Sequence, residues 1–336
     1  MKRNDEENGA DVEPKGGVVP GKRLRRWVTL AVGLLLLAWV LSQVSLPQLA
    51  TVLRHADAPM LAAALALGLL ATALRAIRYT LFFPGHSRWL NLYGAFALMR
   101  LLNLAMPLRT GEVAFLGLLK RHGLAPSIAE TLPVWLVLRL TDVSSLALLL
   151  LAASLHPARP EEWPAAHWIV LALAVAMALS AVATVAIAAR YRTRDAATWL
   201  SSRLAAFRAG WSRVRGLRLM PVMVLAMAIA AAMIGVTTLA QLALASPLPW
   251  LQCALISVMI LAVAMLPIHG PLGLGTFEVT WVGLMAWYDV PVPQAAGIAV
   301  GIRLLGLVLI LIDGALGSLL LAIPETAARP PAGRRP

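Results

Sequence analysis

The feature that most constrains the fold is a series of long apolar segments. The hydrocarbon core of a membrane is about 30 Å thick and needs about 20 helical residues to cross it. Because 60% of the 336 residues are hydrophobic and 13% are charged, no soluble domain of this size could hide the apolar surface. We predict an all-α, polytopic integral membrane protein with about six full spans. They are residues 27–46, 59–83, 128–155, 164–190, 220–246 and 294–323.

Two further apolar segments are interrupted by proline and glycine, and we interpret each as a broken or re-entrant helical hairpin. The first covers residues 89–121, with Pro107 and Gly111 at its break. After that break about ten helical residues remain, roughly half of a bilayer. The second hairpin covers residues 250–288. Its break contains Pro267, Pro271, Gly273 and Gly275.

The two hairpins have similar surroundings, which indicates an inverted repeat. Each ends in a short segment that begins with Glu-Val, at Glu112 and at Glu278, and each is followed by an arginine within a long apolar segment, Arg139 or Arg303. Three predicted crossings separate the two units, so their orientations are opposite. Inverted repeats with discontinuous helices are a recurrent plan of transporters, with the site near the membrane midplane.

Basic residues determine the predicted topology. The chain has 29 Lys and Arg against 16 Asp and Glu, a net charge of +13. Because the basic residues gather between the apolar segments, we attribute them to the positive-inside rule and to anionic headgroups rather than to nucleic acid. This rule places both termini and the arginine-rich loop 190–218 in the cytoplasm. An interfacial helix and an ordinary basic loop both explain that loop.

The membrane region is expected to be flanked by polar ends. Residues 1–21 are polar and rich in Gly and Pro, so we expect a disordered cytoplasmic N-terminus. Residues 22–323 form the transmembrane domain, and residues 324–336 form a cytoplasmic tail. The first apolar segment is too long for a signal peptide and has no small-residue cleavage site closely after it, so we expect an uncleaved first helix.

Ionisable residues inside apolar segments are costly, which makes them candidates for a substrate site. An arginine beside a helix N-terminus binds phosphate oxygens well, and this is the functional interpretation of Arg109 and Glu112. A first-turn acid that stabilises its helix is the alternative for Glu112. The candidates are Arg109, Glu112, Arg139, Asp142, Glu278 and Arg303.

Other charged residues in apolar segments have simpler explanations. Arg139 and Asp142, three positions apart, are equally well explained by an internal ion pair. Arg75 and Arg78 are expected to extend toward lipid headgroups. Asp313 is expected to be solvated or structural, and Arg100 is placed on the leading arm of the first hairpin, where it can add to the site.

No motif of a standard active site or metal centre is present in the sequence. The single Cys253 excludes a disulfide within the chain and a cysteine metal site. The six His show no HExxH spacing, and there is no P-loop and no GxSxG motif. We therefore expect no metal and no cofactor, and a transporter-like protein rather than an enzyme.

At its charged motifs the chain resembles the membrane domain of the lysylphosphatidylglycerol synthases and related stand-alone flippase-like proteins. Leu138 and Leu272 depart from the pattern, because many members have an acid and a glycine there. The resemblance implies lipid handling or translocation in the bacterial cytoplasmic (inner) membrane. The synthases also carry an aminoacyltransferase domain, which we do not expect here because only residues 324–336 follow the last predicted span. The matching residues are Pro107, Arg109, Gly111, Glu112, Arg139, Asp142, Pro271, Gly273, Gly275, Thr276, Phe277, Glu278 and Arg303.

Three functions are compatible with these observations. A lipid flippase or scramblase would hold a phospholipid or polyprenyl-phosphate headgroup with Arg109, Arg139 and Arg303. Glu112 and Glu278 would pair with these arginines when the site is empty. A transferase acting on a lipid-linked donor would use one of the two glutamates as its base, but the sequence has no sizeable extracytoplasmic loop to support it. A scaffold for a lipid-modifying enzyme is the third.

Overall fold

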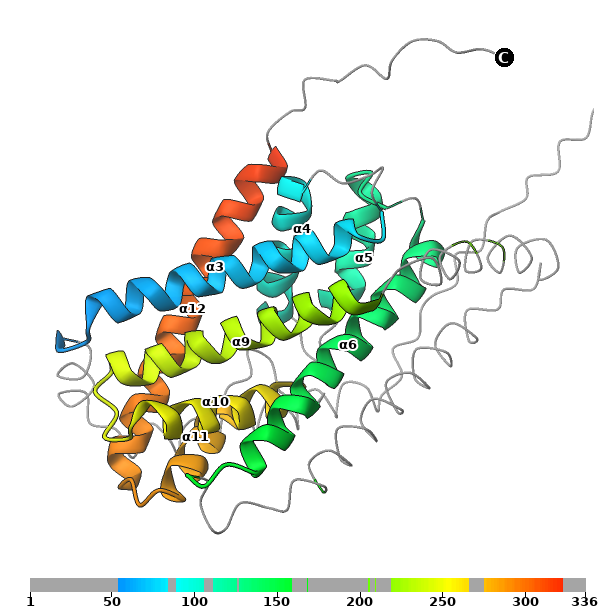
Figure 1. Cartoon of the computed structure of the whole chain (residues 1–336). Coiled ribbons are helices and arrows are strands. Elements are labelled where there is room, and N and C mark those ends of the chain that lie inside the picture. Colours follow the sequence, from blue (N-terminus) through cyan, green and yellow to red (C-terminus); the bar gives the residue numbers. More distant parts are fainter. Residues whose placement is uncertain are drawn as a thin grey trace, which may run out of the picture.

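All the regular structure that the computed structural model describes is helical (Figure 1). Within the described part, eight helices and no strand occur, and four of the helices are long and apolar enough to cross a membrane. These four are α3 (Ala58–Thr80), α6 (Ile128–Ser154), α9 (Leu219–Ala243) and α12 (Val292–Ala322). The prediction of a helical, multi-pass membrane protein is thereby confirmed. The described residues are 54–83, 89–105, 111–125, 127–158, 219–265 and 275–322, with the single residues 168, 205 and 209.

Several predicted features lie outside the described residues. Among them are the polar N-terminus, the spans 27–46 and 164–190, and, apart from two single positions, the basic loop 190–218. The C-terminal tail 324–336 belongs to the same set. Five residues of the two predicted breaks are also outside: Pro107, Arg109, Pro267, Pro271 and Gly273.

Four shorter helices occupy the two predicted hairpins. In each hairpin a helix of 17 or 16 residues is followed by one of 11 residues. A helix of that shorter length rises about 16 Å, roughly half of the hydrocarbon thickness. The four helices are α4 (Trp89–Ala105), α5 (Gly111–Arg121), α10 (Trp250–Met265) and α11 (Thr276–Ala286).

Helices α3 and α9 pack along each other in opposite directions (Figure 1). The backbone N–H of Asp57, which caps α3, donates to the carbonyl oxygen of Ala243 at the end of α9, at 3.0 Å. Gly235 of α9 lies against Leu67 of α3, and a Cβ at this glycine would be 2.9 Å from the leucine side chain. The missing side chain thus permits a close approach of the two helices.

Helices α4 and α12 form a second antiparallel pair, with glycine on both sides of the contact. A Cβ at Gly94 would lie 2.7 Å from the carbonyl oxygen of Gly317, and about two turns further along α4, the side chain of Leu101 lies against Gly314. Small residues at such contacts let the backbones of membrane helices approach closely, so that dispersion forces hold them together. Each of the two pairs therefore joins a helix of the first half to one of the second.

Each hairpin has a buried apolar core of its own. The first core lies among α3, α4, α5 and α6 and contains aromatic rings in contact with one another. The ring centroids of Tyr79 and Phe83 are 5.0 Å apart, and those of Phe96 and Phe115 are 4.7 Å apart. The second core lies among α10, α11 and α12, closed by the ends of α6 and α9. These cores fix the short helices α5 and α11, whose first turns carry the candidate site residues.

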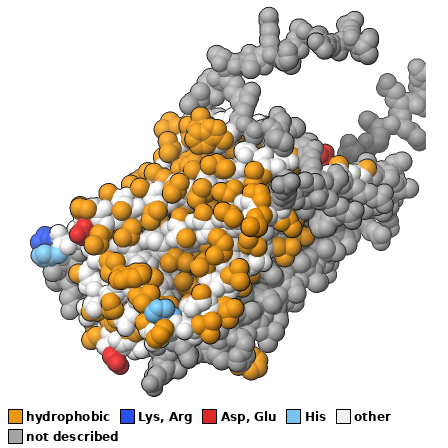
Figure 2. All heavy atoms as spheres, in the orientation of Figure 1, with side chains coloured by type: hydrophobic (Ala, Val, Ile, Leu, Met, Phe, Trp, Pro, Cys, Tyr) orange, Lys and Arg blue, Asp and Glu red, His pale blue; other side chains and the backbone are white. Residues whose placement is uncertain are grey.

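The outer surface of the described helices is mostly apolar. Figure 2 shows hydrophobic side chains over most of the visible face, with the Lys, Arg, Asp and Glu side chains in view at its margins. Leu148, Val308 and Leu311 are each more than half exposed. Such a surface is typical of helices that face hydrocarbon.

Candidate functional site

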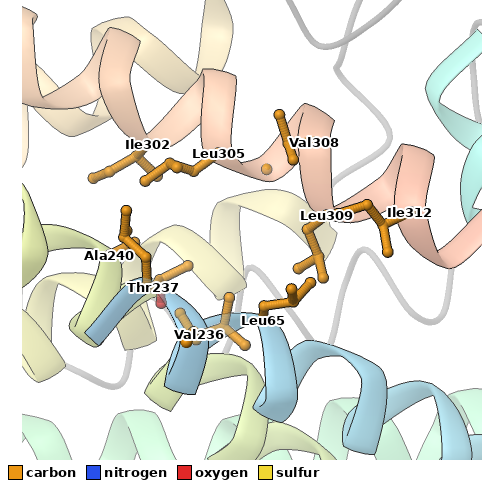
Figure 3. A pocket seen from close by; sticks show the side chains of 13 residues that line it. Leu65, Val236, Thr237, Ala240, Ile302, Leu305, Val308, Leu309 and Ile312 are labelled. Carbon is orange, nitrogen blue, oxygen red and sulfur yellow. The ribbon is translucent and has the colours of Figure 1, made fainter. Parts of the chain in front are cut away.

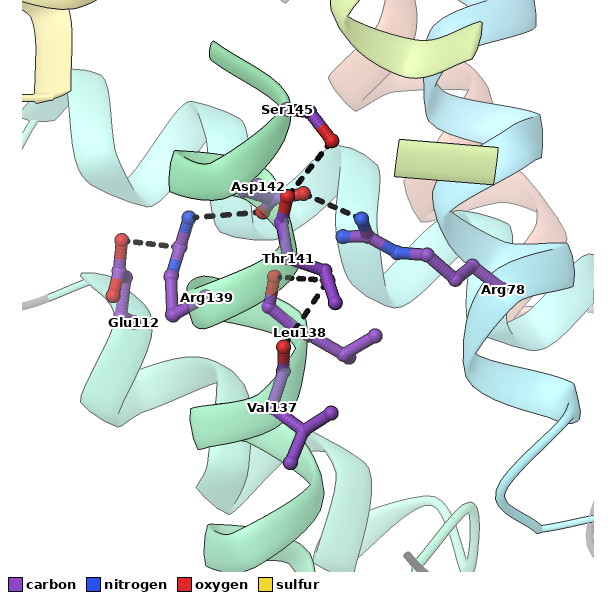
Figure 4. A network of polar contacts seen from close by, with 8 residues as sticks. All are labelled: Arg78, Glu112, Val137, Leu138, Arg139, Thr141, Asp142 and Ser145. Carbon is purple, nitrogen blue, oxygen red and sulfur yellow. Dashed lines mark hydrogen bonds and ion pairs between the residues drawn. The ribbon is translucent and has the colours of Figure 1, made fainter. Parts of the chain in front are cut away.

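The first candidate site joins α5 to α6 through an acid and a base. Glu112 is the second residue of α5, and its Oε1 pairs with the Nη2 of Arg139 on α6 (Figure 4). The guanidinium of Arg139 also lies over the ring of Trp135, 5.4 Å from the ring centroid. A guanidinium that touches both a carboxylate and an aromatic face is held in one orientation.

A second acid continues this contact to α3. Asp142 accepts a hydrogen bond from Nη1 of Arg78 at 2.5 Å, and Nη1 of Arg139 lies 3.7 Å from its other oxygen (Figure 4). We call Arg78, Glu112, Arg139 and Asp142 the first network. The expected contact of Arg139 with Asp142 is present. Each of these two residues makes its shortest ion pair with a residue on another helix, which is Glu112 for Arg139 and Arg78 for Asp142.

Arg78 differs from its prediction. It was expected to extend toward headgroups, but its side chain is buried, with 3% exposure, because it points inward to Asp142. Nη1 of Arg75, one turn earlier, is buried without a hydrogen bond among the described residues. Counting Arg75, the described part of this region holds three cations against two anions. The first network itself is balanced, with two cations and two anions, and the neighbouring Arg75 adds one positive charge that suits an anionic group.

The second candidate site repeats the acid–base pair between α11 and α12. Glu278, the third residue of α11, is 1% exposed, and its Oε1 lies 3.6 Å from Nε of Arg303. The guanidinium of Arg303 lies 5.7 Å from the ring centroid of Phe277. Within the described part of the chain, neither oxygen of Glu278 is hydrogen-bonded, and neither are Nε and Nη2 of Arg303.

This second pair borders a cavity of about 250 Å³ among α9, α10, α11 and α12, most of whose lining residues are apolar; we call it the polar chamber after the charged side chains at its wall. Arg100 of α4 also reaches its wall, so three charged side chains line one space. A buried polar atom without a hydrogen bond costs about 1–3 kcal/mol. The unsatisfied atoms of Glu278 and Arg303 therefore favour a polar occupant, such as a headgroup or water.

A third polar cluster, not predicted from the sequence, ties α3, α4 and α12 together. Asp313 has no exposed surface and accepts from Arg100 at 2.6 Å, Thr72 at 2.8 Å and Tyr93 at 2.5 Å. The predicted structural role of Asp313 fits these contacts, whereas the solvated alternative is wrong. The signal available in the sequence was that an acid and an arginine in separate apolar helices need partners.

The two described glycines of the breaks are required for different reasons. A Cβ at Gly111 would lie 2.5 Å from Oδ1 and 2.6 Å from the backbone N of Asn103, so glycine lets the start of α5 touch the end of α4. Gly275 caps α11 with φ of 78°, in the left-handed region that residues with a Cβ avoid. Both glycines place the following glutamate at the start of a short helix.

Of the six predicted site residues, five are described and fall into two groups. Glu112, Arg139 and Asp142 meet in the first network, and Glu278 meets Arg303 at the polar chamber. Arg109 lies outside the described residues. Among the residues that the structure describes, no group of three His, Cys, Asp or Glu side chains is placed to hold a metal ion.

The fold and these charged pairs define a class, a helical multi-pass membrane protein with paired charges buried between its helices. The family model for the lysylphosphatidylglycerol synthase TM region matches residues 26–314. The chain therefore belongs to this family, whose membrane domain has a lipid-related function. No curated protein and no solved structure matches the chain.

Proposed function

We propose that the protein moves a phospholipid or a related lipid between the leaflets of the bacterial cytoplasmic membrane, as a flippase or scramblase. The observation that carries this proposal is the recurrence of one arrangement. In both halves, a glutamate in the first turn of an 11-residue helix faces an arginine on the following long helix. In both, the arginine also lies over an aromatic ring.

The order of helix lengths supports an inverted repeat of four helices rather than of a hairpin and a span. Helices α3 to α6 have 23, 17, 11 and 27 residues, and α9 to α12 have 25, 16, 11 and 31. The equivalent helices α3 and α9 run antiparallel, as opposite orientations require. Transporters with this plan alternate access around a site between the repeats. We further propose, from the distribution of basic residues, that both termini are cytoplasmic and that residues 22–323 act as one transmembrane domain.

The chemistry of the two pairs suits a phosphate-containing headgroup. A guanidinium binds phosphate with two parallel hydrogen bonds, so a headgroup can replace the glutamate at Arg139 or Arg303. The released carboxylate, Glu112 or Glu278, can then accept from an ammonium or hydroxyl group of the same headgroup. Each pair thus keeps its opposite charges together when empty, although the atoms of Glu278 and Arg303 are not hydrogen-bonded to each other, and offers both charges to a zwitterionic lipid when occupied. Asp142 stays with Arg78 in this scheme and positions Arg139.

Exchange of fluorescent phospholipids in proteoliposomes tests the proposal directly. The purified full chain should accelerate the loss of fluorescence on the inner leaflet, measured by adding dithionite outside. The double variant Arg139→Ala/Arg303→Ala should return the rate to that of protein-free vesicles. Arg54→Ala, at an exposed position before α3, is the matched control and should exchange like wild type.

One result would count against the assigned site, and another would count against the function. Lipid exchange at the wild-type rate by the double variant would show that these two arginines are not part of the site. No exchange by the wild-type chain, together with a lipid-modifying enzyme that co-purifies in stoichiometric amount, would favour a scaffold instead. Mass spectrometry of the lipid retained in mild detergent identifies the headgroup.

A further inference from the structure

A second cavity of about 250 Å³ lies between α3, α9 and α12, and we call it the apolar groove (Figure 3). Its lining is almost entirely aliphatic, with side chains such as Leu65, Val236 and Leu305. The hydroxyl of Thr237, which also lines it, is bonded to the carbonyl oxygens of Met233 and Ile234 in its own helix. Among the described residues that line the groove, Thr237 is thus the one with a polar side chain, and its proton is donated within its own helix.

The apolar groove and the polar chamber share one wall. Five residues line both cavities: Val236, Thr237, Ile302, Gly306 and Leu309. A Cβ at Gly306 would meet no atom within 4 Å, so this part of the shared wall is open space. On one side of the wall are Glu278, Arg303 and Arg100, and on the other side every described lining residue except Thr237 is aliphatic or glycine.

The groove opens sideways to the lipid-facing surface. Val308 and Ile312 on its α12 side are 52% and 41% exposed. Helix α3 packs along α9 over its length but touches α12 much less, mainly where Leu309 lies against Gly68. Figure 3 shows the lining side chains of α12 facing those of α3 and α9 across the space between them. The gap between α3 and α12 is thus the side on which hydrocarbon meets the groove.

We propose that the apolar groove holds one acyl chain of the glycerophospholipid whose headgroup enters the polar chamber, an inference that rests on the proposed function. The adjoining cavities match the two ends of such a molecule, with charges at one end and aliphatic side chains at the other. Its headgroup crosses inside the protein while the acyl chain stays in contact with the bilayer through the gap between α3 and α12.

The groove acts on the rate of exchange more than on affinity. Lipid tails are as apolar as leucine, so moving a chain from the bilayer into the groove gains little free energy. Its effect is to align the chain so that the headgroup approaches Arg303 in a fixed orientation, and orientation of this kind lowers barriers. Blocking the groove should therefore slow exchange without abolishing the charged pair.

A leucine at Gly306 is the variant that tests this inference. It fills open space at the shared wall, whereas Gly283→Leu, in an exposed position of α11 where a Cβ also meets nothing, is the matched control. The probe is a phosphatidylglycerol with a photoreactive diazirine in one acyl chain, in vesicles of phosphatidylglycerol and phosphatidylethanolamine. Labelled peptides are then mapped by mass spectrometry.

In the wild type, labelling should concentrate on the peptides of α3 and α12 that line the groove. Gly306→Leu should lose most of that labelling and slow lipid exchange severalfold, whereas Gly283→Leu should match wild type in both assays. Labelling spread evenly over the exposed faces and unchanged by Gly306→Leu would mean annular lipid only and would overturn the inference.

The two proposals fail in distinguishable ways. If wild-type exchange depends on Arg303 but neither exchange nor labelling responds to Gly306→Leu, the groove inference is wrong and the proposed function stands. If the wild-type chain gives no exchange in any lipid mixture, the proposed function is wrong. The labelling then still reports whether an acyl chain occupies the groove.

Discussion

The two acid–base pairs differ in how fully their own neighbours satisfy them. In the first network, Arg139 contacts Glu112 directly, and Asp142 connects it to Arg78 on α3. In the polar chamber, the acid and base are 3.6 Å apart, and four of their polar atoms have no hydrogen bond in the described part of the chain. In the first half, charged side chains of the protein thus satisfy the acid–base pair. In the second half, the corresponding pair lacks hydrogen bonds among the described residues and borders a cavity.

Under the proposed function, this difference corresponds to one conformation of an alternating carrier. The half that satisfies its arginine internally and the half whose arginine is open to a headgroup would exchange roles in the opposite state.

The largest effect is expected from Arg303→Leu. It leaves Glu278, almost fully buried, without its cation, and breaking a buried ion pair costs about 3–5 kcal/mol. Lipid exchange should fall to background, and the melting temperature in detergent should drop sharply. The double variant Glu278→Leu/Arg303→Leu should recover most of the stability, because no unpaired charge remains, but none of the exchange. A double variant as unstable as the single one would show that the pair itself does not cause the loss.

Asp142→Ala should be the next most damaging change. Arg78 then loses the partner that allows it to be buried, at a cost of about 3 kcal/mol. Exchange should fall only in part, because the contact of Arg139 with Glu112 remains. Measured on the same preparation, the melting temperature should therefore fall strongly while the rate of lipid exchange falls only in part. Equal losses in both would argue that Asp142 contacts the lipid itself.

The two break glycines should respond differently to alanine. Gly111→Ala places a Cβ against the backbone of Asn103, so α5 must move away from α4, at a cost of about 1–3 kcal/mol. Gly275→Ala forces a left-handed conformation at a cost of about 1–2 kcal/mol. Gly283→Ala, in the exposed interior of α11, should stabilise slightly, by up to about 1 kcal/mol. Chemical unfolding in mixed micelles measures the free energy of unfolding of the three variants. A Gly283→Ala variant less stable than Gly111→Ala would contradict the prediction.

The smallest effect is expected from the aromatic partner in the closed half. Trp135→Leu removes the contact with Arg139, which at a partly exposed site contributes about 0.5–1 kcal/mol. The loss should be small because Glu112 still orients the guanidinium. Phe277→Leu should slow exchange more, because Arg303 lacks a comparably close acid. A greater loss of lipid exchange in Phe277→Leu than in Trp135→Leu would show that the two halves hold their arginines differently, and equal losses would contradict it.

The helices and the repeated acid–base pairs were predictable, but their cross-connections were not. Length and apolarity determine where a span lies, and Glu-Val after a break marks each short helix. The contacts of Arg78 with Asp142 and of Arg100 with Asp313 join residues 64 and 213 positions apart. Because these helices are apolar on most sides, no periodicity indicates which face turns inward. The apolar groove, likewise, arises from the spacing of three helices and has no sequence motif.

The glycine contact between α4 and α12 has a consequence for motion. The backbones at Gly94 and Gly317 touch, and the buried pair of Arg100 with Asp313 lies along the same seam. We therefore expect the two helices to move as one rigid body that carries a piece of each half, while rearrangement takes place at looser contacts. Cysteine cross-links along this seam should leave exchange intact, whereas cross-links across the gap between α3 and α12 should stop it. In the proposed transport cycle, this contact would then hold α4 and α12 together while other helices move.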